Sequence, residues 1–215
     1  MDDQEIIALF AAFREANPTP RGALRFQSPF QLLVAVVLSA QSTDVGVNRV
    51  TPALFAEAGD PEAMLRQGEA WVRERIRSLG LFNNKARALV ALSRILVERF
   101  HGRVPETRAE LESLPGVGRK SANVVLNIAF GQPTLAVDTH VFRVANRTGL
   151  ACGKTPESVE KELTRRIPAE FLLHAHHWLI LHGRHVCTAR RPACDACRIA
   201  RWCAMDRAQN EDAHR

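Results

Sequence analysis

The sequence predicts an all-α protein, on three observations. Apolar residues recur three and four positions apart through most of the chain, which is the spacing of one face of a helix. A helix-capping residue followed directly by proline, a common helix start, occurs at Ser28-Pro29, Asp60-Pro61 and Thr155-Pro156. No segment shows convincing strand alternation. With 215 residues, 46% of them hydrophobic, the chain can form a sizeable core, in one large or two small domains.

The N-terminal half is predicted to contain a central apolar helix flanked by amphipathic ones. Residues 5–16 carry apolar side chains at helical spacing, and the proline-containing stretch 17–22 is predicted to be a linker. The helix from Pro29 through Leu38 is apolar on nearly all sides, so we expect it at the centre of a domain. Further helices are predicted near Thr43, from Pro61, over 71–78 and over 85–100, with breaks at 39–44 and 80–84.

Two helices joined by a glycine hairpin are predicted in the middle of the chain. Thr107 and Glu110 form a capping box that opens a short helix, and residues 116–118 form a tight hairpin after it. A second helix, over 119–130, carries an apolar run that predicts its burial. Three more helices are predicted at 139–148, 156–166 and 169–182.

The hairpin is predicted to bind an anion. Gly116 and Gly118 allow a ligand to approach the backbone closely. The N–H groups at the start of the next helix, at Arg119, favour a negative charge. We interpret these residues, with Val117 between them, as a contact for a phosphate of a nucleic-acid backbone. The alternative is a helical turn that binds no ligand.

Lys120 and Asp138 are the predicted catalytic residues. Lys120 lies in the first turn of a helix expected to be buried, where the positive helix end and desolvation should lower its pKa from about 10 toward 7–8. A neutral amine can attack an electrophilic carbon and form a Schiff base. The chain has four lysines and twenty-five arginines, and an arginine could not act in this way. Asp138 lies at a helix N-cap position; it either caps the helix or serves as a base that stabilises positive charge.

Four of the five cysteines lie close together near the end of the sequence, at Cys187, Cys194, Cys197 and Cys203. This grouping argues against a disulfide framework and for a shared metal centre in a cytosolic protein. Spacing alone leaves zinc and a [4Fe–4S] cluster open. Cys152 is interpreted as a small packing residue. The five histidines within residues 174–185 are interpreted as packing and polar-face residues rather than as a second metal site.

The chain is basic, with a formal net charge of +6 and a pI near 9.5. This charge favours a polyanionic partner, although a general bias toward arginine would produce it too. The acidic N-terminus, residues 1–5, is unlike a targeting peptide. The longest apolar run, 32–38, is far shorter than the ~18 residues that span a bilayer. We therefore expect a cytoplasmic, monomeric protein with no membrane contact.

Several stretches of the chain together resemble one family. They are 39–44 (SAQSTD), 80–86 (GLFNNKA), 114–123 (LPGVGRKSAN), 137–140 (VDTH) and 177–184 (HWLILHGR), followed by the four clustered cysteines. Over nearly its whole length the chain resembles the helix–hairpin–helix DNA glycosylases, and within that superfamily the endonuclease III family. The resemblance implies that the four cysteines hold a [4Fe–4S] cluster with a structural role.

The resemblance also implies two helical domains flanking a DNA-binding cleft. Residues 22–132 would form a six-helix domain that contains the helix–hairpin–helix. Residues 1–21 and 133–215 would form the iron–sulfur cluster domain. Lys120 and Asp138 would then face each other across the cleft, a usual location for an active site.

Further residues are expected to contact duplex DNA. By the resemblance, Gln41 and Leu81 would enter the duplex and fill the space of an extruded nucleotide, which offsets the cost of unstacking. Arg190 and Arg191 are expected to contact phosphates, or otherwise to neutralise the anionic cluster. His140, two residues from Asp138, is expected to touch DNA, or otherwise to be solvated.

The residues and the resemblance together predict a bifunctional DNA N-glycosylase and AP lyase of base excision repair, acting on double-stranded DNA with damaged bases or abasic sites. Lys120 would attack C1′ and expel the base, while Asp138 stabilises the developing charge. The Schiff base would then undergo β-elimination, which nicks the strand 3′ to the abasic site. Oxidised pyrimidines are the implied substrates. The alternatives are a monofunctional glycosylase and a non-enzymatic helix–hairpin–helix DNA-binding module.

Overall fold

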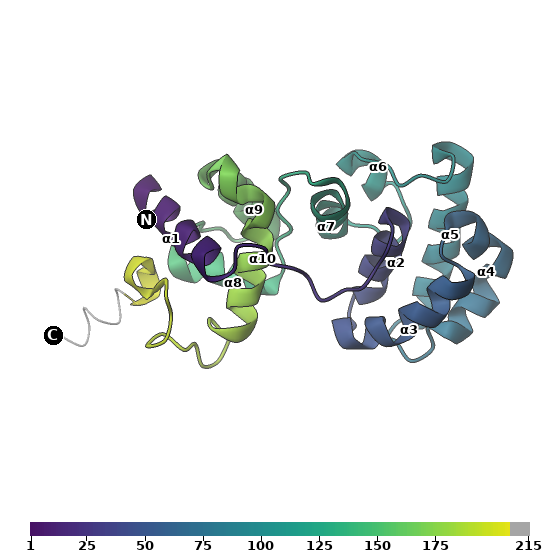
Figure 1. The fold of residues 1–215 in the computed structure, drawn as a ribbon, viewed down its shortest axis with the longest axis horizontal. Helices are drawn as coiled ribbons and strands as arrows, with labels where there is room; N and C mark the ends of the chain where they lie inside the picture. Colours follow the sequence, from purple (N-terminus) through teal and green to yellow (C-terminus); the bar gives the residue numbers. More distant parts are fainter. Residues whose placement is uncertain (207–215) are drawn as a thin grey trace. The chain divides into compact units, whose positions relative to one another are not determined.

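The computed structural model describes residues 1–206, and every regular element in this part of the chain is a helix (Figure 1). The all-α prediction is therefore confirmed. The chain divides into two compact units: Ala23–Gln132, and Met1–Gly22 together with the chain from Pro133 onward. The last part of the domain expected from the resemblance, 207–215, lies outside the described residues.

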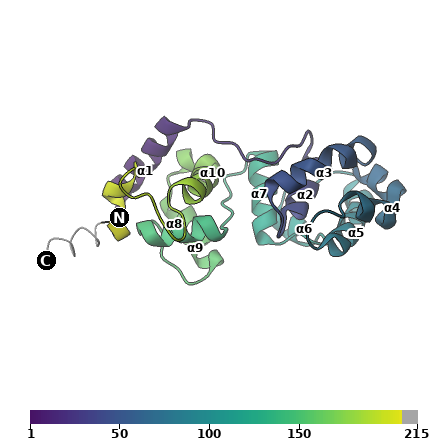
Figure 2. The same cartoon turned by 90° about the horizontal axis from the view of Figure 1, so that it is seen from below.

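The unit Ala23–Gln132 consists of six helices in chain order. They are α2 (Pro29–Ser39), α3 (Asp44–Glu57), α4 (Pro61–Arg75), α5 (Phe82–Phe100), α6 (Arg108–Glu112) and α7 (Arg119–Phe130). Helix α2 packs against α3, α5 and α7 (Figure 2). Because α2 is apolar on nearly all sides, neighbours on several faces are needed to remove it from water. Its predicted central position is confirmed.

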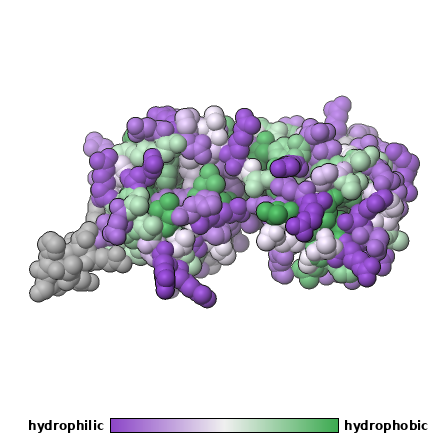
Figure 3. Space-filling view, turned by 60° about the horizontal axis from the view of Figure 1, so that its bottom comes forward, coloured by the Kyte–Doolittle hydropathy of each residue, from purple (hydrophilic) through white to green (hydrophobic). Residues whose placement is uncertain are grey.

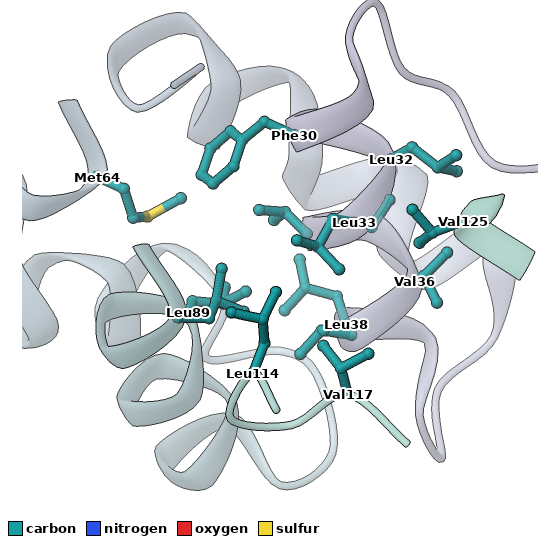
Figure 4. Close-up of a cluster of buried hydrophobic side chains, with 14 of the residues drawn as sticks. Phe30, Leu32, Leu33, Val36, Leu38, Met64, Leu89, Leu114, Val117 and Val125 are labelled. Carbon is teal, nitrogen blue, oxygen red and sulfur yellow. The ribbon is translucent and has the colours of Figure 1, made fainter. Parts of the chain in front are cut away.

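The core of this unit is built around α2 and reaches the glycine hairpin. Figure 4 shows Leu33 and Leu38 of α2 next to Leu89 of α5, with Leu114 and Val117 approaching from the hairpin side. Each side chain of this kind contributes roughly 1.5–3 kcal/mol when it is fully buried. The hairpin is thus held by apolar packing from beneath, and its outer backbone remains at the surface.

Two predicted boundaries in this unit differ from the structure. The helix expected over 71–78 is the second of two helical segments within α4, separated from the first by non-helical backbone at Gly68 (φ 76°, ψ 171°), and it ends at Arg75, three residues earlier than expected. The loop expected over 80–84 is too long, because α5 begins at Phe82. Leu81 precedes it in a left-handed conformation, which ordinary helix-start patterns do not reveal.

The other unit is built from helices at both ends of the chain. They are α1 (Asp3–Ala16), α8 (Thr139–Thr148), α9 (Pro156–Arg166), α10 (Ala169–His185) and the short 3-10 helix η1 (Ala200–Trp202). Helix α10 packs against α8 and α1, and Phe10, Phe171 and Trp178 form an aromatic group between them. Helix α10 extends three residues beyond the predicted end, and η1 is too short to leave a periodic pattern.

The surface is mixed in character. On the face drawn in Figure 3, apolar areas lie between hydrophilic side chains. The large hydrophobic side chains that are exposed are Ile7, Phe26, Val45 and Leu81. Within residues 1–206, no helix combines the length and the hydropathy that crossing a membrane requires.

Candidate functional site

The hairpin is anchored in the core of its unit through the buried side chains of Leu114 and Val117. Thr107 caps α6 by accepting a hydrogen bond from the N–H of Glu110 (3.3 Å), as predicted. The Glu110 carboxylate, however, accepts from the Thr107 hydroxyl (2.6 Å) rather than from its backbone. Val117 is buried, and its N–H donates to the carbonyl of Leu114 (3.1 Å). Contact between Val117 and a ligand is therefore restricted to its carbonyl group.

The fold requires glycine at one of the two hairpin positions, 116, but not at the other, 118. Gly116 has a φ of +81°, and a Cβ there would lie 3.0 Å from the Cβ of Ala88, so the fold itself needs glycine. Gly118 has ordinary extended dihedrals, and a Cβ there would meet no protein atom within 4 Å. The fold does not require glycine at 118. Its bare backbone leaves open space at the N-terminus of α7, where no side chain caps the helix.

Lys120 lies in the first turn of α7 and is exposed, as is Arg119 before it. The prediction that Lys120 is desolvated is wrong. Burial in α7 begins at Ala122, and the two residues that open the helix, Arg119 and Lys120, lie outside the core. Lys120 still lies at the N-terminus of α7, and because its side chain is exposed, a ligand bound at the hairpin can reach its amine.

Asp138 lies in the other unit and caps α8, as predicted. One carboxylate oxygen, Oδ1, accepts hydrogen bonds from the N–H groups of His140 (2.9 Å) and Val141 (2.8 Å). The second oxygen, Oδ2, accepts none from residues 1–206. The capping role and a chemical role are therefore compatible, because each can use its own oxygen. Whether Lys120 and Asp138 face each other stays a prediction.

Helix α8 links Asp138 to the cysteine loop through residues that the sequence analysis missed. Arg143 lies against Nδ1 of His140 (3.2 Å) and donates to the carbonyls of Gly183 (2.7 Å) and Cys187 (3.0 Å). Because arginine only donates, Nδ1 of His140 accepts, and a neutral ring carries its proton on Nε2. The sequence signal that could have identified these contacts is the i, i+4 spacing of Arg143 and Arg147, which places both arginines on one face of the helix that Asp138 caps.

Gln41 and Leu81 lie on two neighbouring loops of the unit Ala23–Gln132, and both are exposed. Leu81 is 51% exposed. Both residues have positive φ, +52° for Gln41 and +58° for Leu81. Such backbone costs on the order of 1–3 kcal/mol for a residue with a side chain and is concentrated at functional sites. The two positions predicted to enter DNA thus share exposure and a strained backbone.

The four clustered cysteines line one pocket in the unit that contains α8 and α10. His182 lies there too, with Nε2 at 3.7 Å from Sγ of Cys197, and burial lowers the pKa of His182 to about 4. Burial also raises the pKa of the Cys197 thiol, so binding a metal would release its proton. Within residues 1–206, no three His, Cys, Asp or Glu side chains are close enough to hold a metal ion.

The donor set of the pocket, four cysteine thiols, suits a metal ion or an iron–sulfur cluster. A single zinc would require four sulfurs at about 2.3 Å from one point. A four-iron cluster is larger, so its thiolate ligands surround a volume rather than a point. Four cysteines around one pocket provide the thiols for either.

The loop between the first two cysteines is tied to α8 by Arg147. Its guanidinium donates to the carbonyls of Thr188 and Ala189 (both 2.7 Å) and lies 3.7 Å from Sγ of Cys187. Arg190 and Arg191 are exposed, do not line the pocket, and their guanidinium groups bond to no other side chain within residues 1–206. Arg147 is therefore placed to offset negative charge at Cys187, and Arg190 and Arg191, outside the pocket lining, are available to an outside anion.

Cys152 lies at the surface, and two of the histidines make packing contacts. Cys152 is exposed, so its interpretation as a packing residue is wrong; it follows the end of α8 in a surface turn. His176 bonds the carbonyl of Ala136 (2.8 Å), and His174 contacts the ring of Trp178. These contacts agree with the packing role predicted for His174 and His176, whereas His182 lines the cysteine pocket.

Known proteins resemble this chain in sequence and in fold. The model of the HhH-GPD superfamily of base excision DNA repair proteins matches residues 34–169. Endonuclease III of Escherichia coli K12 is 53% identical over 203 residues, covering 94% of this chain and 96% of that protein. Endonuclease III of Rickettsia conorii is 53% identical, with 94% and 97% covered. A structure described as a trapped endonuclease III–DNA covalent intermediate superimposes with a TM-score of 0.90 at 40% identity, covering 98% and 99%.

The chain belongs to the HhH-GPD superfamily and, within it, to the endonuclease III family. This confirms the resemblance seen in the sequence and makes the protein a DNA glycosylase of base excision repair.

Proposed function

We propose that the protein is a bifunctional DNA glycosylase and AP lyase that removes oxidised pyrimidines from double-stranded DNA. The observation that carries the proposal is an accessible lysine, Lys120, in the first turn of the hairpin's second helix. The bare backbone at Gly118 beside it leaves room for a phosphate at the helix N-terminus. A covalent DNA intermediate of a relative with the same fold supports a nucleophilic mechanism.

Lys120 and Asp138 divide the chemistry. The amine of Lys120 forms a bond to C1′ through its nitrogen lone pair as the bond from C1′ to the base breaks, and the base leaves with the electron pair. Asp138 stabilises the positive charge that develops on the sugar. The attached nitrogen then loses a proton, its electron pair forms the C1′=N bond, and the C1′–O4′ bond of the sugar ring breaks, with O4′ taking up a proton; this gives the Schiff base. The Schiff base loses a proton from C2′, and the bond from C3′ to its phosphate oxygen breaks, so that the phosphate leaves with the electron pair. The products are a free base and a strand nicked 3′ to the abasic site.

The cysteine pocket would hold a [4Fe–4S] cluster through Cys187, Cys194, Cys197 and Cys203. Such a cluster would cross-link the loop 187–203, which contains little regular structure of its own. Arg147 and Arg143 hold the same loop to α8, the helix that Asp138 caps. The loop in turn presents Arg190 and Arg191 to the DNA backbone. The proposed domains are therefore a helix–hairpin–helix domain, 22–132, and a cluster domain.

Duplexes with a single defined lesion test this function. The wild-type protein should release an oxidised pyrimidine and should also nick a duplex that already contains an abasic site. Base release without nicking would indicate a monofunctional glycosylase. Binding with neither reaction would indicate a DNA-binding module.

The cluster proposal predicts the composition of the purified protein. It should be brown and contain about four irons and about four sulfides per chain. Cys194→Ser should lower the iron content and expose the loop 187–203 to proteolysis, because one of the ligands is lost. Cys152→Ser is the matched control, since Cys152 is exposed and does not line the pocket. A colourless, folded and active protein with one zinc would contradict the proposal.

The phosphate contacts predict a change in salt dependence. Arg190→Ala with Arg191→Ala should weaken binding to all duplexes and reduce the slope of log affinity against log salt by about one per lost contact. Arg165→Ala is the control, because Arg165 is exposed and already paired with Glu162 (2.6 Å). Binding is measured by fluorescence anisotropy at several salt concentrations. A slope that stays at the wild-type value would show that neither arginine contacts phosphate.

A further inference from the structure

Lys85, on α5, is a buried lysine that the proposed chemistry does not use. Its residue is only 5% exposed, and its Nζ donates to Oγ of Ser42 (2.8 Å). It forms no ion pair with a carboxylate among residues 1–206. Burying a lysine without an acidic partner is costly and rare. In agreement, burial lowers the pKa of Lys85. A side chain kept under these conditions calls for a functional reason.

The Lys85–Ser42 hydrogen bond joins the two loops that carry Gln41 and Leu81. Ser42 follows Gln41 directly in the chain. Lys85 lies one helical turn after Leu81, and its N–H donates to the carbonyl of Leu81 (3.0 Å). One lysine therefore holds the backbone at Leu81 through its amide and the loop of Gln41 through its side chain.

The backbones of the two loops also approach each other closely. A Cβ added at Gly80 would lie 3.3 Å from the carbonyl oxygen of Gln41, so glycine permits this approach. Leu79, next to Gly80, is buried and lies near Gly46 at the start of α3. The two loops are therefore packed together beneath their exposed residues.

Both exposed residues need external support for their conformation. Gln41 and Leu81 have positive φ, a region that L side chains rarely adopt. Such backbone persists only where the surrounding contacts determine it. The hydrogen bond of Lys85 is a contact that reaches both loops at once.

We propose that Lys85 is a positioning residue that fastens the Gln41 loop to the Leu81 loop, so that the two side chains enter damaged DNA as one rigid unit. This inference rests on the proposed role of Gln41 and Leu81 in the duplex. Lys85 itself does not touch the DNA. Its effect is therefore expected where a nucleotide must be unstacked, and not in the chemistry at C1′.

The first measurement compares two substrates. Gln41→Ala and Leu81→Ala should slow base release from a paired lesion more than cleavage at a ready-made abasic site, which has less to unstack. Lys85→Met keeps an apolar stem of similar length. It should likewise slow base release from the paired lesion, by about tenfold, more than it slows cleavage at the abasic site. Lys161→Met, at an exposed lysine of α9, is the matched control and should change neither rate.

The second measurement tests whether the two loops act together. In the wild-type background, the effects of Gln41→Ala and Leu81→Ala on base release should deviate from multiplicative behaviour by at least about threefold. In the Lys85→Met background the two effects should multiply. Ser42→Ala should remove the coupling from the other side of the hydrogen bond, and Ser42→Thr, which retains a hydroxyl, should preserve it.

The outcomes separate this inference from the function on which it rests. If Gln41→Ala and Leu81→Ala slow both substrates equally, the proposed entry into the duplex is wrong, and the inference fails with it. If they slow base release selectively but remain coupled in both Lys85→Met and Ser42→Ala, only the positioning role of Lys85 is overturned. Thermal unfolding of each variant shows that the rates are compared between folded proteins.

Discussion

Borohydride added during turnover should join the wild-type protein covalently to DNA, and Lys120→Arg should abolish the adduct while DNA binding persists. Reduction converts a Schiff base into a stable amine, so it reports the nucleophile directly. Arginine keeps the positive charge at the N-terminus of α7 but cannot supply the lone pair. The expected effect is therefore a loss of trapping to background on a duplex that the variant still binds. Gel electrophoresis under denaturing conditions measures the adduct.

Peptide mapping of the trapped complex identifies the reacting amine. The adduct should lie on Lys120, and Lys154→Arg, at an exposed lysine far along the chain, is the control that should trap normally. Lys85 is the informative competitor, because burial lowers its pKa and would favour a neutral amine. An adduct on Lys85, Lys154, Lys161 or the N-terminal amine would show that the assignment is wrong. Base release with no adduct at all would establish a monofunctional enzyme.

Asp138→Asn should slow base release and strand cleavage by at least ~10²-fold, the low end for a general acid–base group. The structure explains why folding should be spared. Oδ1 of Asp138 caps α8, and an amide oxygen can accept the same two hydrogen bonds. The substitution exchanges Oδ2, the oxygen left over for chemistry, for an amide group that carries no negative charge. Single-turnover rates and thermal unfolding together separate the two roles.

Asp60→Asn is the matched control for this prediction. Asp60 caps α4 in the same way, accepting from the N–H of Ala63 (2.7 Å), and it has no proposed role in the reaction. It should leave both rates and the melting temperature nearly unchanged. Asp138→Ala should lose activity and also about 1 kcal/mol of stability, because alanine cannot cap. Equal activity of Asp138→Asn and the wild type would leave Asp138 with the capping role alone.

The sequence by itself determined the features that depend only on residues close together in the chain. Thr107, Asp138 and Thr155 were recognised as helix caps, and the bounds of α7 and α8 were predicted, because capping and helix termination are local interactions. Gly116 and Gly118 marked the hairpin for the same reason. The family could also be recognised, since its motifs are short runs of consecutive residues.

Only the tertiary structure decided which side chains are exposed and which distant residues meet. The apolar run of α7 suggested that Lys120 is buried, but Arg119 and Lys120 lie outside the core that the helix enters from Ala122 on. The hydrogen bonds from Arg147 to the cysteine loop and from Lys85 to Ser42 join residues about forty positions apart. No local pattern encodes such pairs, because they form only when packing of the helices brings the two segments together.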